Sequence, residues 1–257
     1  MRPSRRVVRR SCRDTVLRGR VNPADDLAAE SLAAVVGERS IQSHQVLLSA
    51  AVTAADWARA GAPHGAVVVT DHQIAPRGRA GRPWTVTAGR DLAFALVLRP
   101  QVASEREGWL YAVVLAALAD ACGGGATIEW PDELRREGVM AAAAGIEVKL
   151  GGLTIKWAVV NVLIRDAQPP RGELLGAVLR AIDTRLADTP RAVLDDYVAL
   201  CATIGRDVRV RLLGGATRLQ GRALEVTDDG SLLLETDTGR RVPVRPQDIS
   251  SIDGMSF

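Results

Sequence analysis

The sequence predicts an α+β fold, in which a larger domain with a mixed sheet is followed by a small C-terminal β-barrel. Two observations support this prediction. Segments with helical apolar spacing are interspersed with strand pairs up to residue 203, and only short strands separated by glycine-containing turns follow. The 257 residues, of which 47% are hydrophobic, suffice for one large core and a small appendage. We therefore expect a basic, disordered extension over residues 1–22, a larger domain over 23–203 and a barrel over 204–257.

The first half of the larger domain is predicted to alternate helices and strands. Leu27 and Leu32 would face inward from the first helix, and Gly61 would end the second, because glycine interrupts a helix. The expected elements are a helix over Ala24–Val36, a weak strand over Ile41–Leu48, a helix over Ala54–Ala60, and strands over Gly65–Thr70 and Leu92–Leu98.

The second half contains the strongest helix signal, over Glu105–Cys122. Leu110, Val114 and Leu118 repeat at helical spacing, and the glycines at 123–125 stop the pattern. The elements expected after it are a strand over Thr127–Trp130, a turn, paired strands over Ile146–Leu150 and Leu153–Ile164, and helices over Gly172–Ala187 and Pro190–Cys201.

Short strands are expected to dominate the chain after Ile204. Asp-Gly and Thr-Gly turns fall between them, and such turns join antiparallel strands. The strand candidates are Val208–Leu213, Arg218–Val226, Ser231–Glu235 and Arg240–Val244. Their spacing predicts a five-stranded barrel.

Charge and cysteine content limit the class of protein. Residues 1–20 hold eight arginines and one acid, so the rest of the chain is net acidic although the whole carries +3. A disordered extension or a misassigned start explains this arm better than nucleic-acid binding does. No run of 18 apolar residues predicts a membrane span. The cysteines, Cys12, Cys122 and Cys201, are odd in number and far apart, which indicates a reducing compartment and a cytoplasmic location.

The most informative stretch is Gln73-Ile-Ala-Pro-Arg-Gly-Arg-Ala-Gly-Arg-Pro-Trp84, which joins two strand candidates. Arginine side chains bind phosphate and carboxylate groups through two parallel hydrogen bonds. Glycines allow a loop to approach an anion closely. On these residues alone, a solvated basic turn is as good an interpretation as an anion-binding loop.

This stretch closely resembles the adenylate-binding loop of biotin–protein ligases, Gln-x-x-Gly-Arg-Gly-Arg-x-Gly-Arg-x-Trp. The matching residues are Gln73, Arg77, Gly78, Arg79, Gly81, Arg82 and Trp84. Pro76 replaces the first glycine and removes one backbone N–H donor. The resemblance extends in order over residues 25–253, including the Thr203-Ile-Gly that opens the barrel.

The resemblance implies a biotin/lipoate ligase-like catalytic domain and an SH3-like barrel. It implies the formation of biotinyl-adenylate from biotin and ATP, with Mg²⁺ at the phosphates, and transfer of the biotinyl group to a carrier-domain lysine. The implied partner is a biotin carboxyl carrier domain or an acyl-CoA carboxylase subunit, and a homodimer is left open. No helix-turn-helix precedes the catalytic region, so a DNA-binding repressor is not indicated, and neither a membrane nor a nucleic-acid partner is expected.

Four further family motifs are altered in this chain. The Ser-Thr-Asn that contacts biotin aligns either with Val52-Thr53-Ala54, keeping the threonine, or with Ser49-Ala50-Ala51, keeping the serine. Lys-Trp-Pro-Asn-Asp reads Glu129-Trp130-Pro131-Asp132-Glu133, which places extra carboxylates near the nucleotide.

The third altered motif carries the adenylation lysine, and either Met140 or Ala142 takes its place. The chain has only two lysines, Lys149 and Lys156, and an exposed strand position is a better interpretation of Lys156 than one that reaches inward. The family's Gly-x-Gly-x-Asn strand keeps Asn161 but has bulky Trp157 and Val159 for glycines.

We expect a divergent biotin–protein ligase with weak or absent activity, a pseudoenzyme in the extreme case, with no catalytic residue and no metal ligand assigned. One alternative is an active ligase that tolerates these changes; the other is a scaffold that binds a carrier domain or carboxylase without chemistry. The candidate substrate-binding residues are Thr53, Gln73, Arg77, Gly78, Arg79, Gly81, Arg82, Trp84, Trp130, Asp132 and Asn161.

Overall fold

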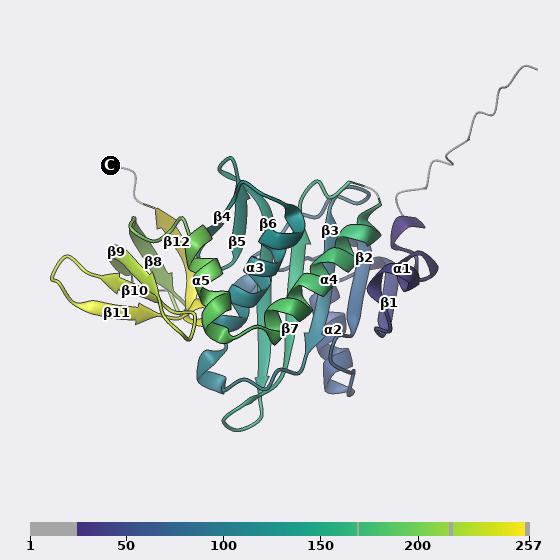
Figure 1. Cartoon of the computed structure of the whole chain (residues 1–257), viewed down its shortest axis with the longest axis horizontal. Coiled ribbons are helices and arrows are strands. Elements are labelled where there is room, and N and C mark those ends of the chain that lie inside the picture. The colour runs from purple at the N-terminus through teal and green to yellow at the C-terminus, as the bar shows by residue number, and fades with distance from the viewer. Residues whose placement is uncertain (1–24, 169, 216–217, 255–257) are drawn as a thin grey trace, which may run out of the picture.

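The computed structural model describes residues 25–168, 170–215 and 218–254, so the expectation for residues 1–22 lies outside the described residues. A seven-stranded sheet forms the centre of the larger part (Figure 1). Its order is β1 (Ile41–Leu47), β2 (Val67–Gln73), β3 (Leu92–Leu98), β7 (Ile155–Ile164), β6 (Val139–Leu150), β5 (Glu133–Arg136) and β4 (Ala126–Glu129). Only the β1–β2 pair is parallel, so the sheet is mixed as predicted.

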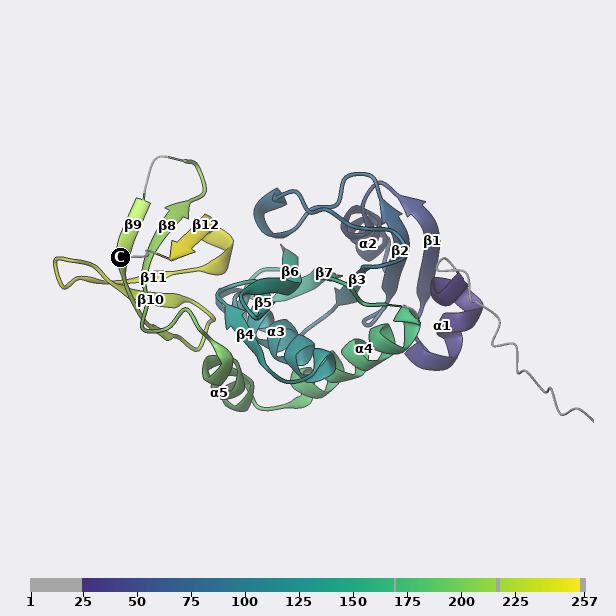
Figure 2. The same ribbon diagram turned by 90° about the horizontal axis from the view of Figure 1, so that it is seen from above.

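Helices cover both faces of this sheet. The helices are α1 (Ala29–Val36), α2 (Ala50–Arg59), α3 (Trp109–Cys122), α4 (Arg171–Ala187) and α5 (Pro190–Leu200). Figure 2 shows α3 and α4 on one face and α2 on the other. Short 3₁₀ turns lie at Asp25–Leu27, Arg79–Gly81, Ser104–Arg106 and Pro246–Asp248.

Strand β3 shows why the central strands are continuously apolar. Its residues alternate between two cores, with Phe94 and Leu96 packed against the α3 side and Ala95 and Val97 packed under α2. Because both faces are covered, every residue of β3 is buried. The core under α2 is built largely from alanines, and small side chains let the helix lie close to the sheet.

The C-terminal part forms a second, five-stranded antiparallel sheet. Its order is β11 (Arg241–Val244), β10 (Leu232–Glu235), β9 (Arg218–Val226), β8 (Asp207–Leu212) and β12 (Ile249–Gly254). Alternating residues such as Val208, Val210, Leu232 and Leu234 face inward and are fully buried. The predicted α+β fold with a small C-terminal β domain is confirmed.

Several boundaries differ from expectation, for physical reasons. Strand β6 begins at Val139 instead of Ile146, and β5 occupies part of the expected turn. The intervening alanines favour strands only weakly, and burial against the helices overrides that preference. Helix α2 begins at Ala50 instead of Ala54, because Gln73 Oε1 accepts the Ala50 N–H at 2.8 Å.

Candidate functional site

The arginine loop, residues 74–91, folds back on itself as a short hairpin after β2. The Gly78 N–H donates to the Arg82 carbonyl at 2.8 Å, and the Trp84 N–H donates to the Pro76 carbonyl at 3.0 Å. In this hairpin Pro76 takes part through its carbonyl, so the hydrogen bond to Trp84 does not need the N–H that proline lacks. The Trp84 ring covers Gly78 so closely that a Cβ there would lie 2.3 Å from it, so position 78 requires glycine.

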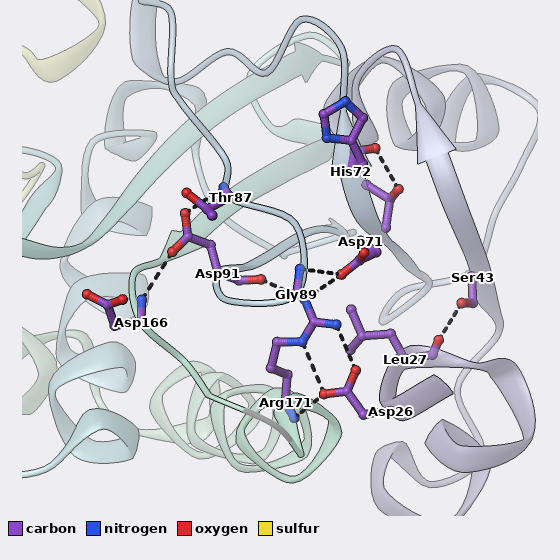
Figure 3. A network of polar contacts seen from close by, with 11 residues as sticks. Asp26, Leu27, Ser43, Asp71, His72, Thr87, Gly89, Asp91, Asp166 and Arg171 are labelled. Atoms are coloured by element: carbon purple, nitrogen blue, oxygen red, sulfur yellow. Dashed lines mark hydrogen bonds and ion pairs between the residues drawn. The ribbon is translucent and has the colours of Figure 1, made fainter. Parts of the chain in front are cut away.

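A buried guanidinium supports the returning half of the loop (Figure 3). The Arg171 side chain is fully buried and pairs with Asp26 at 2.7 Å and with Asp71 at 2.6 Å. The same Asp71 accepts the Gly89 N–H at 2.9 Å, while Arg171 donates to the Asp91 carbonyl at 3.0 Å. These charge-assisted bonds fix the loop's end to β2 and to the start of α4.

A cavity of about 340 Å³ lies between the loop, the start of α2, and strands β6 and β7. We call it the loop cavity, and Ser49, Ala51, Arg77, Gly145, Val159 and Asn161 are among its lining residues. Ser49 and Asn161 are each 3% exposed, and among the described residues Ser49 Oγ and Asn161 Oδ1 have no hydrogen-bond partner. Asn161 Nδ2 donates to the Arg77 carbonyl. Buried polar atoms without partners are costly, so this cavity suits a polar ligand.

The three loop arginines have different environments. Arg77 and Arg82 are exposed, whereas Arg79 is 3% exposed. Arg79 Nε lies 3.2 Å from the Asp132 carboxylate, and Arg79 Nη1 donates to the Ile249 carbonyl of the C-terminal domain at 2.5 Å. Burial raises the pKa of Asp132, and Arg79 opposes this shift. Arg79 thus joins the loop to the C-terminal domain and is not free to swing toward a ligand.

The Glu129–Glu133 segment is divided between two environments: its first residues face the C-terminal domain, whereas Asp132 and Glu133 line a cavity beside the loop. Glu129 pairs with Arg206 at 2.8 Å, and that cation neutralises the carboxylate expected to repel phosphate. Trp130 is 1% exposed and donates its indole N–H to the Gly230 carbonyl at 3.1 Å. Trp130 therefore belongs to the core at the domain junction and lines neither cavity beside the loop.

The structure places two residues of the Ser49–Ala51 alignment at the loop cavity, and one residue, Val52, of the alignment at 52–54. Ser49 and Ala51 line the loop cavity, whereas Thr53 does not, and its hydroxyl donates to the Ser49 carbonyl at 3.2 Å. Ala54 is fully buried on the side of α2 that packs against the sheet. In the alignment at Ser49, Ala51 stands where the family has asparagine, and Ala51 lines the cavity. Thr53 lies inside α2, which begins at Ala50, and does not line the cavity.

The structure distinguishes between the two alignments of the motif lysine. Ala142 is fully buried against the α3 side of the sheet, while Met140 lies on the loop side and lines a second cavity of about 200 Å³. The pairing of β5 with β6 shifts register between these two positions, and residues 140 and 142 therefore face opposite sides of the sheet. That second cavity also brings together Arg79, Arg82, Trp84 and Asp132. Lys149 and Lys156 are exposed at the far end of β6 and β7.

Comparison with known proteins agrees with this arrangement. Residues 203–251 match the family model for the biotin protein ligase C terminal domain. The biotin–[acetyl-CoA-carboxylase] ligase of Mycobacterium tuberculosis is 30% identical over 210 residues, covering 72% of this chain and 78% of that protein. The chain belongs to the biotin protein ligase family.

Other proteins are similar to this family member over most of its length. The bifunctional ligase/repressor BirA of Bacillus subtilis is 29% identical over 240 residues, covering 80% of this chain and 72% of that protein. The solved biotin protein ligase from Aquifex aeolicus in complex with biotin and ATP has a TM-score of 0.67 at 17% identity, covering 84% of this chain and 99% of that one. The second likeness establishes the fold alone. Among the described residues, no helix of this ligase-family chain is long and apolar enough to cross a membrane.

Gly145 is a residue of the site that the sequence interpretation missed. A Cβ at this position would lie 2.9 Å from the backbone of both Gly78 and Arg79. A glycine inside a strand indicates such a close approach, but the strand was expected to begin at Ile146, so Gly145 was not placed inside one.

We therefore expect Gly145→Ala to displace the loop from β6 and to weaken ligand binding in the loop cavity at least tenfold. Calorimetric titration with biotin would measure the loss. Gly151→Ala, in the exposed β6–β7 turn, is the matched control, and equal affinities of the two variants would contradict the role given to Gly145.

Proposed function

We propose that this protein binds biotin and ATP at the arginine loop and forms biotinyl-adenylate slowly. In that reaction a biotin carboxylate oxygen attacks the α-phosphorus and pyrophosphate leaves. A carrier-domain lysine amine then attacks the biotinyl carbonyl carbon and AMP leaves. Acetyl-CoA carboxylase is the proposed source of the carrier domain, in line with the name of the Mycobacterium tuberculosis relative.

The observation that carries the proposal is the pair of unpartnered buried atoms, Ser49 Oγ and Asn161 Oδ1, in a cavity closed by the loop. A hydroxyl can donate and accept, and an amide oxygen accepts, so together they suit a ligand with N–H and C=O groups. Biotin carries such groups on its ureido ring. The residues present therefore fit biotin.

The fit to the nucleotide supports slow chemistry. Arg77 and Arg82 remain exposed for phosphate, and Arg79 Nη2 has no hydrogen-bond partner among the described residues. However, Asp132 and Ile249 already hold the rest of the Arg79 guanidinium, and Met140 cannot supply the cation that the family lysine supplies. Within the described ranges, no group of three His, Cys, Asp or Glu side chains is placed to hold a metal ion.

Binding should be measurable even where turnover is slow. Isothermal titration with biotin, ATP and biotinyl-adenylate is expected to show biotin binding that Ser49→Ala weakens about five- to tenfold, since a hydrogen bond is worth about 1–1.5 kcal/mol. Ser250→Ala, at an exposed C-terminal hydroxyl, should leave the affinity unchanged. Absence of binding for all three ligands would refute the proposal, and would favour the scaffold alternative if a carrier domain still bound.

A further inference from the structure

A second groove has a lining distinct from that of the loop cavity. The β6–β7 turn projects from one end of the sheet (Figure 1), and the Leu153 carbonyl in this turn accepts the Ser104 N–H beside the groove. The groove runs between the connection from β3 to α3 and the junction of α4 with α5, and encloses about 460 Å³. Its lining includes Arg99, Val102, Arg106, Trp109, Leu186 and Pro190, and we call it the α3 groove. The volume lies within the ~300–1,000 Å³ range of small-molecule sites.

Two hydrogen-bond donors in the wall of this groove lack acceptors. Trp109 is only 4% exposed, and its indole Nε1 has no partner among the described residues. The Arg106 Nε is likewise buried without a partner. The guanidinium of Arg106 stacks over the Trp109 ring, with Cζ 5.9 Å from the ring centroid. Arg106 Nη2 donates to the Asp228 carbonyl at 3.1 Å, so Nε is the unpaired donor of this guanidinium. Two unpaired donors, one of them cationic, call for an anionic acceptor.

The other residues that line the α3 groove indicate the apolar part and the net charge of the ligand. Val102, Leu186 and Pro190 add apolar surface beside the Trp109 ring. Arg99 holds its own place by donating to the Ala62 and Ala58 carbonyls at 2.9 and 3.0 Å, so its positive charge stays at the rim. The groove's acidic residue, Asp188, is exposed and lies 3.9 Å from Arg185, so it only partly offsets the two arginines. We propose that the α3 groove binds a small amphipathic anion, whose carboxylate meets Arg106 and the Trp109 indole N–H and whose apolar body lies along Leu186 and Pro190.

This site is separate from the proposed biotin and nucleotide site. The α3 groove is lined by residues just before β2 and just after β3, whereas the arginine loop joins the opposite ends of these strands. None of the residues that the structure describes lines both cavities. Occupancy of the groove can therefore be tested whether or not the loop cavity binds biotin.

The test uses the full chain and the probe 3-phenylpropionate. The chain has five tryptophans, so an ¹H–¹⁵N spectrum shows few indole N–H resonances, and Trp109→Phe identifies that of Trp109. We expect 3-phenylpropionate to shift the Trp109 indole N–H resonance downfield in a saturable manner. The neutral isostere 3-phenylpropanamide and inorganic phosphate should each bind at least tenfold more weakly. The amide lacks the negative charge, and phosphate lacks the apolar body.

Arg106→Gln should weaken 3-phenylpropionate binding at least tenfold. The matched control is Arg59→Gln, which removes the other stacked arginine, 5.8 Å from the Trp157 ring and outside the groove, and should leave this binding unchanged. An unmoved Trp109 resonance up to 10 mM probe would overturn the proposal. So would equal binding of the amide, equal binding of phosphate alone, or undiminished binding by Arg106→Gln.

Discussion

Arg79→Met is expected to lower the free energy of unfolding by about 3–5 kcal/mol, because removing one partner leaves the other charge buried and unpaired. Methionine keeps most of the apolar stem, so the change isolates the loss of charge and hydrogen bonds. The substitution strands the Asp132 carboxylate and also removes the bond to the Ile249 carbonyl. Urea unfolding at neutral pH would measure the loss.

The loss of stability in Arg79→Met is expected to depend on pH in a definite direction. Burial already raises the pKa of Asp132 above its ordinary value, and the variant loses the guanidinium that opposes the shift. A carboxyl group with a raised folded pKa binds its proton more tightly in the folded state, so stability falls as pH rises through that pKa. The deficit of Arg79→Met should therefore be smallest below the ordinary pKa of an aspartate and should grow toward neutrality.

Two companion variants test the interpretation. Arg77→Met removes an exposed arginine from the same loop and should change stability by no more than about 0.5 kcal/mol. Arg79→Met combined with Asp132→Asn should be more stable than Arg79→Met alone, since no buried charge is then stranded. A double variant as unstable as the single one would show that the loss came from packing or from the lost bond to the Ile249 carbonyl, and not from the ion pair.

The sequence predicted the architecture well because local and global signals agree in it. The continuous apolar run of β3 and the helical spacing of α3 reflect burial on every side, and both elements were predicted. The start of β6 was not, because the run from Met140 to Ala144 carries little preference of its own. Only its long-range pairing with β5 and β7 makes it a strand.

The candidate site was predicted less completely, because contacts between residues far apart in the sequence decide the environment of each site residue. The three loop arginines have similar sequence contexts, yet only Arg79 meets Asp132 and the C-terminal domain. Glu129 had the appearance of a repulsive charge, and its partner Arg206 lies 77 residues further along the chain. No local pattern reveals such pairs. Whether Met140 or Ala142 replaces the motif lysine likewise depended on a register shift that spacing alone does not show.

Catalysis should be slow in the native protein and should recover when the loop-side cation is restored. Loss of one transition-state donor costs about 10²–10³ in rate, so pyrophosphate release with biotin and ATP should fall below that of the Mycobacterium tuberculosis relative by this factor or more.

The two bulky residues at the family's glycine positions, Trp157 and Val159, lie in different environments. Val159 lines the loop cavity, whereas Trp157 packs under α2 and does not. Replacing Trp157 would remove a buried ring at a cost of about 3–5 kcal/mol without opening the site. Val159→Gly alone should therefore provide the space.

We accordingly expect Met140→Lys with Val159→Gly to raise adenylate formation about ten- to a hundredfold. Residue 140 lies on the loop side beside Arg82 and Asp132, so a lysine there can reach the phosphates and share the charge of Asp132. Ala142→Lys with Val159→Gly is the matched control, because position 142 faces the apolar core under α3. That control should lose stability, since it buries an unpaired ammonium, and should gain no activity. Recovery by the residue 142 variant and not by the residue 140 variant would show that the motif lysine aligns with position 142 and that the loop side of β6 is not where adenylation occurs.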